Sequence, residues 1–206
     1  MPFITFEGVE GCGKSTQARL AAQRLRAAGR PVVETREPGG TDIGLKIRDI
    51  LMNPAHTHLD PVAEWLLYEA DRRQHVRELL APAVAEGNFV LCDRYSDATE
   101  AYQQEGRGMD AAAVRSVDAL ARGGLQPDLT LLYDLDPRLG LERARQRDGR
   151  VGRFEAAEGA FHERVRATYL AIARREPERV AVIAADGPAE KVFEETWRRI
   201  ASRFDL

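Results

Sequence analysis

Residues 8–15, Gly-Val-Glu-Gly-Cys-Gly-Lys-Ser, have the types and spacing of a phosphate-binding loop. The glycines let successive backbone N–H groups turn inward around phosphate oxygens, and the N-terminus of a following helix adds positive charge. Lys14 would reach the terminal phosphates, and the Ser15 hydroxyl would hold Mg²⁺. An apolar run before the loop and a helical pattern after it disfavour the alternative, an accidental glycine-rich turn. We assign nucleotide binding to Gly8, Val9, Glu10, Gly11, Cys12, Gly13, Lys14, Ser15 and Thr16.

An acidic and a basic residue, Asp93 and Arg94, follow the apolar run at residues 89–92. At the end of a strand, a carboxylate can order Mg²⁺ or its water ligands, while a guanidinium can bind a phosphate through two hydrogen bonds. Phosphoryl transfer needs both charges there. A surface pair that caps the strand is the alternative. We predict catalytic roles for both residues, in addition to Lys14, and a metal site formed by Ser15 and Asp93.

The stretch at residues 138–153 contains six arginines, two acidic residues and no lysine, in a chain whose net charge is −3. A solvated helix face is the ordinary explanation of such a run. Arginine to the exclusion of lysine, placed after a strand, instead favours a lid that closes over phosphates. We predict an arginine-rich lid at about residues 140–153, whose catalytic candidates are Arg143, Arg147, Arg150 and Arg153.

Glu10 lies inside the loop, where its carboxylate would repel a bound triphosphate unless another group compensates the charge. A metal ion, a substrate hydroxyl or an arginine could do so, and we expect one of these as its partner. The alternative is a side chain that faces solvent.

Tyr68 and Arg72 lie four residues apart on a predicted helix, so both side chains project from the same face. The ring can stack on a base, and the guanidinium can donate to O4 of thymine, where cytosine carries an amino group. Ordinary packing of the ring, with the guanidinium in solvent, is the alternative for such a pair.

Apolar runs rich in β-forming residues alternate with helical patterns along the sequence, which predicts an α/β fold with a parallel sheet and helices on both faces. The predicted strands are residues 3–6, 31–35, 89–92, 129–135 and 180–184. The predicted helices are residues 14–28, 42–52, 61–85, 110–121, 137–147, 158–175 and 189–204. Ligands bind such sheets beyond the carboxyl ends of the strands, which is where the motifs lie.

The chain of 206 residues shows no internal repeat and no linker, which predicts a single domain over residues 1–206. Its slight acidic excess argues against a protein that coats nucleic acid. The first residues carry no basic flank and no long apolar run, so we expect no membrane association and a cytoplasmic location. The sequence has no Asn-Lys-x-Asp run, which disfavours a GTP-dependent switch.

Four further segments resemble the bacterial thymidylate kinase family. They are residues 6–8 (Phe-Glu-Gly), 36–41 (Arg-Glu-Pro-Gly-Gly-Thr), 93–95 (Asp-Arg-Tyr) and the arginine-rich stretch at 140–153. The resemblance spans most of the chain. It implies a P-loop nucleoside-monophosphate-kinase fold with five parallel strands, transfer of the γ-phosphoryl group of ATP to dTMP with Mg²⁺, and commonly a homodimer.

The resemblance also implies roles for residues of the acceptor site. It places Arg94 on the acceptor phosphate, Glu10 near the sugar, and the ring of Tyr102 close to the sugar, where it disfavours a ribose 2′-hydroxyl. A helix residue half-buried in the core is the alternative for Tyr102. The remaining acceptor-binding candidates are Arg36, Arg48, Tyr68, Arg72 and Thr99. In bacterial members with an acidic residue and no arginine in the loop, the catalytic arginines come from the lid.

Three positions depart from the usual family pattern. Tyr68 stands where phenylalanine is common, residues 104–106 (Gln-Glu-Gly) replace a glycine-richer run, and residues 96–100 differ. These departures concern contacts with the base more than contacts with phosphates. A kinase for another nucleoside monophosphate, or a nucleotide-gated binding protein without turnover, are the alternative functions.

Overall fold

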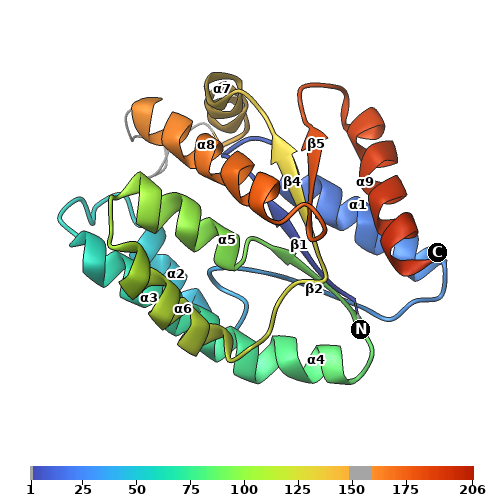
Figure 1. Ribbon diagram of the computed structural model, residues 1–206, viewed down its shortest axis with the longest axis horizontal. Helices are drawn as coiled ribbons and strands as arrows, with labels where there is room; N and C mark the ends of the chain where they lie inside the picture. Colours follow the sequence, from blue (N-terminus) through green and yellow to red (C-terminus); the bar gives the residue numbers. More distant parts are fainter. Residues whose placement is uncertain (1, 149–158) are drawn as a thin grey trace.

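Five parallel strands run through the centre of the computed structural model, which describes residues 2–148 and 159–206 (Figure 1). The strands are β1 Phe3–Glu7, β2 Val32–Arg36, β3 Phe89–Asp93, β4 Leu129–Asp134 and β5 Val180–Ala184. Their order in the sheet is β2-β3-β1-β4-β5. The predicted five-stranded parallel sheet is confirmed, and each strand lies within one residue of its predicted bounds.

The central strand β1 lies between β3 and β4, and its register fixes which loops are neighbours. Phe6 pairs with Asp93 of β3, and Glu7 pairs with Leu132 of β4. The carboxyl ends of parallel strands meet at the same edge of a sheet. The loop after β1 and the residues after β3 are therefore held side by side.

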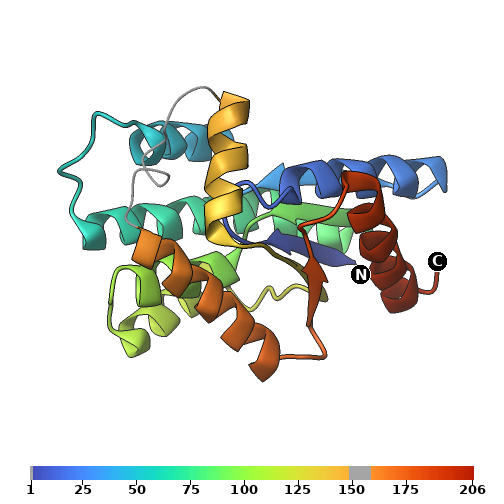
Figure 2. The same ribbon diagram turned by 90° about the horizontal axis from the view of Figure 1, so that it is seen from above.

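Helices cover both faces of the sheet, as predicted. α1 Lys14–Ala27 and α9 Ala189–Phe204 contact each other on one face, and α8 Gly159–Arg175 covers the other (Figure 2). The other helices are α2 Asp42–Met52, α3 Pro61–His75, η1 Val76–Leu80, α4 Ala81–Ala85, α5 Ser96–Thr99, η2 Glu100–Gly106, α6 Ala111–Arg122 and α7 Pro137–Asp148.

Side chains of β1 alternate between the two faces, because successive residues of a strand point in opposite directions. Ile4 and Phe6 are fully buried in the same apolar cluster as Ala21 and Leu25 of α1. Glu7 points the other way, toward α8, and is also fully buried. A carboxyl group in the sheet interior needs hydrogen-bond partners, and these belong to the site described below.

Two helical segments differ from the prediction. The single helix predicted at residues 61–85 is divided into α3, the π-helical turn η1 and α4. Pro82 has no N–H to donate to the preceding turn, and a wider turn before it accommodates the lost hydrogen bond. Residues 96–106, for which no helix was predicted, form α5 and η2. No helix within the described ranges combines the length and apolar character needed to cross a membrane.

Candidate active site

The loop after β1 lines a pocket largely with backbone groups. Gly8, Gly11 and Gly13 have positive φ angles of 140°, 68° and 91°, which side chains rarely tolerate. Gly13 precedes α1 without any side-chain cap, so the first N–H groups of α1 stay available to a ligand. The pocket beside the loop measures about 200 Å³ and is lined by Gly11, Gly13, Lys14, Ser15, Thr16 and Arg143.

Helix α7 begins in direct contact with this loop, at a place where only glycine fits. A Cβ atom added to Gly11 would lie 2.0 Å from the carbonyl oxygen of Gly140, and one added to Gly140 would lie 2.2 Å from the carbonyl oxygen of Glu10. Both distances are far below van der Waals contact. Because neither glycine has a side chain, the first turn of α7, where the predicted lid begins, can pack directly against the phosphate-binding loop.

Ser15 and Asp93, the two predicted metal ligands, contact each other. The Ser15 hydroxyl donates to the Asp93 carboxylate, across the edge at which β1 and β3 are paired. A hydroxyl and a carboxylate are oxygen ligands of the kind that Mg²⁺ takes, and protein sites for Mg²⁺ usually add phosphate oxygens to one or two side chains. Within residues 2–148 and 159–206, no group of three or more His, Cys, Asp and Glu side chains could hold a metal ion by itself.

A second cavity, of about 180 Å³, opens beside the loop and contains the predicted acceptor site. Of the predicted acceptor-binding residues, it is lined by Glu10, Arg48, Tyr68, Arg72, Arg94, Thr99 and Tyr102. Arg36 is exposed and does not line the cavity. Burial and the neighbouring charge of Arg36 lower the pKa of Arg48. Two cations so close together at the rim favour an anionic ligand.

Arg94 lines the second cavity, and the residue before it, Asp93, contacts Ser15 of the first. The Arg94 guanidinium Nη2 donates to Glu10 Oε1 at 3.2 Å and to the Tyr102 hydroxyl at 3.0 Å, while Nη1 donates to the Tyr169 hydroxyl at 3.2 Å. The side chain is 18% exposed. Arg94 is thus oriented by fixed partners and still open to the cavity, as a phosphate-binding arginine must be.

Glu10 has the arginine partner that its position in the loop required. Its side chain is only 14% exposed, which excludes the solvent-facing alternative. Oε1 also accepts from the Tyr102 hydroxyl at 2.7 Å, and Oε2 lies 3.4 Å from Nδ1 of the buried His162. Burial opposes ionisation of this carboxyl group, but the adjacent His162 ring and the charges of Arg94 and Lys14 outweigh it and lower its pKa to about 2.

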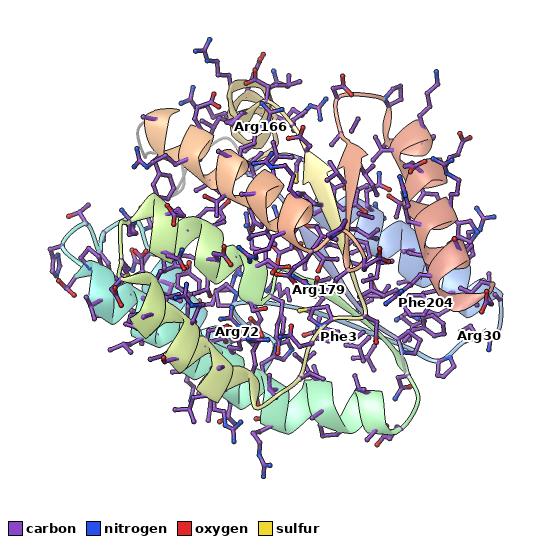
Figure 3. All side chains as sticks on the ribbon, in the orientation of Figure 1. Phe3, Arg30, Arg72, Arg166, Arg179 and Phe204 are labelled. Carbon is purple, nitrogen blue, oxygen red and sulfur yellow. The ribbon has the colours of Figure 1, made fainter. Side chains whose placement is uncertain are left out.

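Arg72 is buried between α3, α6 and the sheet and is surrounded by acidic side chains (Figure 3). Its acceptors are Glu37 at 2.9 Å, Glu69 at 3.0 Å, Thr99 at 2.8 Å, Asp118 at 3.2 Å and the Tyr95 carbonyl at 3.1 Å. The alternative of a guanidinium in solvent is excluded, because the residue is 2% exposed. A guanidinium has five N–H groups, so this network leaves at most one hydrogen of Nη2 for a ligand in the cavity.

Comparison with known proteins identifies the family. A family model described as thymidylate kinase matches residues 6–196. The thymidylate kinase of Desulfosudis oleivorans is 53% identical over 196 residues, which cover 92% of this chain and 92% of the relative. The thymidylate kinase of Deinococcus radiodurans is 48% identical over 201 residues, which cover 98% and 97% of the two chains. The chain belongs to the thymidylate kinase family.

A solved structure of the thymidylate kinase family agrees with this fold. Thymidylate kinase from Ehrlichia chaffeensis matches the structure with a TM-score of 0.78 at 32% identity and covers 97% of each chain. The predicted family and the P-loop nucleoside-monophosphate-kinase fold are thereby confirmed.

The predicted lid arginines of this family member are described only in part. Arg143, on α7, lines the pocket of the phosphate-binding loop and donates to the carbonyl oxygens of Ala185 and Asp186 at 2.9 and 3.2 Å. It therefore ties α7 to the loop after β5 (Figure 2). The side chain of Arg147, and all of Arg150 and Arg153, lie outside the described residues.

Several side chains of the site escaped the sequence analysis. Gln103 lines the acceptor cavity, and His162 and Tyr169 of α8 contact Glu10 and Arg94. His162 and Tyr169 are seven residues apart, a spacing that places both on one face of a helix. That spacing was the available signal, but it also fits ordinary core residues, so it could not show what the two side chains contact.

Proposed function

We propose that this thymidylate kinase family member transfers the γ-phosphoryl group of ATP to dTMP, giving dTDP and ADP. The observation that carries the proposal is that two cavities adjoin the loop after β1, one lined by Lys14 and Ser15 and the other by Glu10 and Arg94. The phosphate-binding loop supports the donor assignment, and the cavity lined by Arg94, Tyr68 and Arg72 supports the acceptor assignment.

On the donor side, Lys14 and the loop amides are proposed to hold the triphosphate. Ser15 and Asp93 would hold Mg²⁺, because their hydroxyl and carboxylate oxygens already contact each other. When bound with ATP, the ion would neutralise phosphate charge. The lid arginines Arg143, Arg147, Arg150 and Arg153 are proposed to close over the phosphates and exclude water.

On the acceptor side, Arg94 is proposed to orient the dTMP phosphate for in-line attack. Glu10 and Tyr102, which share a hydrogen bond, would contact the sugar. Arg48 and Arg36 would add positive charge at the rim, in agreement with the lowered pKa of Arg48. No covalent intermediate on the enzyme is needed, because positioning and charge stabilisation suffice for phosphoryl transfer.

The base would be bound by Tyr68, Arg72 and Thr99, all of which line the cavity. Tyr68 offers a ring for stacking. Arg72 offers an N–H donor for O4 of thymine, and its guanidinium has no acceptor for the amino group of cytosine.

A homodimer is proposed for the assembly. Helix α3 lies beside both α2 and α6 (Figure 1). Their exposed apolar side chains are Ile43, Leu45 and Ile50 on α2, Val62 and Leu66 on α3, and Leu120 on α6. An apolar surface of this extent suits the self-complementary interface of a twofold dimer.

The experiment that tests this function is ADP release measured with dTMP, dUMP, dCMP, dGMP and dAMP in turn. dTMP should give the highest kcat/KM by a wide margin. A preference for another monophosphate would replace the substrate assignment. Binding of both nucleotides without ADP release would instead support a nucleotide-gated binding protein.

A further inference from the structure

Arg94 has a backbone conformation that must be held in place. Its φ angle is 71°, in the left-handed region that residues other than glycine rarely adopt. Such a conformation costs free energy and persists only where surrounding contacts fix it. The Arg94 N–H donates to the Phe6 carbonyl at 3.0 Å, and the Cys92 thiol donates to the Arg94 carbonyl at 3.0 Å.

The buried carboxyl group of Glu7 holds the next peptide unit. Its Oε1 accepts the Tyr95 N–H at 2.6 Å, one residue past Arg94. Glu7 is the last residue of β1, and the pairing of β1 with β3 brings it beside the turn at Arg94. This hydrogen bond therefore fixes the direction in which the chain leaves β3.

The second oxygen of Glu7 reaches the side chain of Arg94 through one intermediate. Oε2 accepts from the Tyr169 hydroxyl at 2.7 Å, and that hydroxyl accepts from Arg94 Nη1 at 3.2 Å. Glu7 is fully buried and Tyr169 is 2% exposed, so neither can contact a substrate directly. One carboxyl group thus restrains both the backbone and the guanidinium of the same arginine.

We propose that Glu7 and Tyr169 are positioning residues that set the orientation of Arg94 toward the acceptor phosphate. The inference rests on the proposed binding of the dTMP phosphate by Arg94.

Burial of Glu7 shows that this arrangement is costly. Burial and the nearby charge of Asp97 raise the pKa of Glu7 to about 8, against the opposing effects of Arg94, Tyr169 and the Tyr95 N–H. An apolar residue would fill the same volume without this cost. A carboxyl group at this place is therefore best explained by the two groups that it orients.

The molecule supplies a matched control for Tyr169. Tyr133 is a fully buried tyrosine of β4, and its hydroxyl makes one hydrogen bond, to Thr196 at 3.0 Å. Tyr133→Phe removes a buried hydroxyl of the same kind without touching Arg94. Any effect of Tyr169→Phe that exceeds the control comes from the contact with Arg94 and Glu7.

The test compares Tyr169→Phe, Glu7→Met, Glu7→Gln and Arg94→Ala with Tyr133→Phe. For each variant, KM for dTMP, KM for ATP and the inhibition constant of thymidine are measured. Thymidine has no phosphate, so its binding reports on the cavity without Arg94's phosphate contact. Glu7→Met removes both acceptors at nearly constant volume, whereas Glu7→Gln keeps an acceptor for the Tyr95 N–H and a polar group beside Tyr169.

Tyr169→Phe is expected to raise KM for dTMP about tenfold, the usual effect of leaving a buried donor unsatisfied. KM for ATP and the inhibition constant of thymidine should stay within about twofold of wild type, because neither ligand places a phosphate on the proposed Arg94 contact. Glu7→Met should have a larger effect on KM for dTMP, and Glu7→Gln should recover most of it.

The inference is overturned if Tyr169→Phe matches Tyr133→Phe in KM for dTMP while Arg94→Ala raises it strongly. A parallel rise in the inhibition constant of thymidine would also overturn it, because that result means a general loosening of the cavity. If Arg94→Ala itself leaves KM for dTMP unchanged, the proposed role of Arg94 fails and this inference fails with it. If Glu7→Met does not fold, Tyr169→Phe decides the question with the thymidine measurement.

Discussion

The donor and acceptor sides of the site are built in different ways. The proposed donor side is built mainly on one segment, residues 8–16, which offers backbone N–H groups, glycine conformations and the N-terminus of α1, and only Asp93 and Arg143 join it from other elements. The acceptor side is assembled from β1, α3, the end of β3, η2 and α8, and its side chains hold one another in place. A backbone site tolerates changes in many of its side chains, whereas a side-chain network loses several contacts with each substitution.

This difference predicts that substitutions on the acceptor side affect stability and binding together, while those on the donor side affect turnover alone. Arg72 and Lys14 represent the two cases. Arg72 is buried among three carboxylates, and Lys14 makes one hydrogen bond, to the Val9 carbonyl at 3.3 Å.

Arg72→Ala should have the largest effect. It leaves Glu37, Glu69 and Asp118 without their buried cation, so the free energy of unfolding should fall by about 3–5 kcal/mol in urea denaturation. In the protein that remains folded, kcat/KM for dTMP should fall about tenfold to a hundredfold, and discrimination against dCMP should shrink. The control is Arg73→Ala at the exposed neighbouring position. An Arg72→Ala variant with native stability and an unchanged dTMP to dCMP ratio would contradict both the network and the base assignment.

Lys14→Met should lower turnover by about a hundredfold or more, because it removes the point charge on the β and γ phosphates. The free energy of unfolding should change little, since the side chain is half-buried at the start of α1 and makes one hydrogen bond. The exposed Lys191→Met on α9 serves as control. Near-native turnover in folded Lys14→Met would remove the assignment of the donor site.

Glu10 and Glu7 should respond to pH with opposite signs. The pKa of the Glu10 carboxyl group is about 2 in the folded protein, against about 4.5 in the unfolded chain. Its ionised form therefore stabilises the fold at any pH above about 4.5, and this stabilisation is lost as the pH falls toward 2. The difference in free energy of unfolding between wild type and Glu10→Gln should therefore shrink by about 3 kcal/mol as the pH falls from about 4.5 to about 2.

The pKa of Glu7 is raised to about 8, so wild type should lose stability relative to Glu7→Gln as pH rises from about 4.5 to about 8. Urea denaturation over this pH range measures both differences. If the stability difference between wild type and Glu7→Gln changed with pH in the same direction as that between wild type and Glu10→Gln, the opposite pKa shifts of the two carboxyl groups would be contradicted.

Tyr68 should give the smallest effects. Tyr68→Phe keeps the ring and should be nearly neutral for dTMP kinetics. Tyr68→Ala should weaken dTMP by about 1–3 kcal/mol, the usual value of stacking a base on an aromatic ring. Equal losses in the two variants would mean that the hydroxyl, and not the ring, contributes to binding.

The same contrast explains what could be predicted from the sequence. The five strands and the phosphate-binding loop follow from local patterns, because β runs, turn glycines and helix starts are encoded within a few residues of each other. The division of the 61–85 helix was also a local matter, and Pro82 was its visible cause.

The acceptor network could be predicted only in outline. Tyr68 and Arg72 were found through i,i+4 spacing and resemblance, and both line the cavity. Four of the five partners of Arg72 lie outside its own helix, so no spacing rule could show that its guanidinium is nearly saturated. The contacts of Glu7 with Tyr95 and Tyr169 join residues 88 and 162 positions apart, and only the register of the sheet brings them together.

The central claim is that the two cavities act as donor and acceptor sites for one phosphoryl group. The direct measurement follows the label from γ-labelled ATP in the presence of dTMP and Mg²⁺. The label should appear in dTDP in proportion to ADP formed, and Arg94→Ala should reduce this transfer far more than it reduces ATP binding. Label that appears in inorganic phosphate, with dTMP unchanged, would contradict the account.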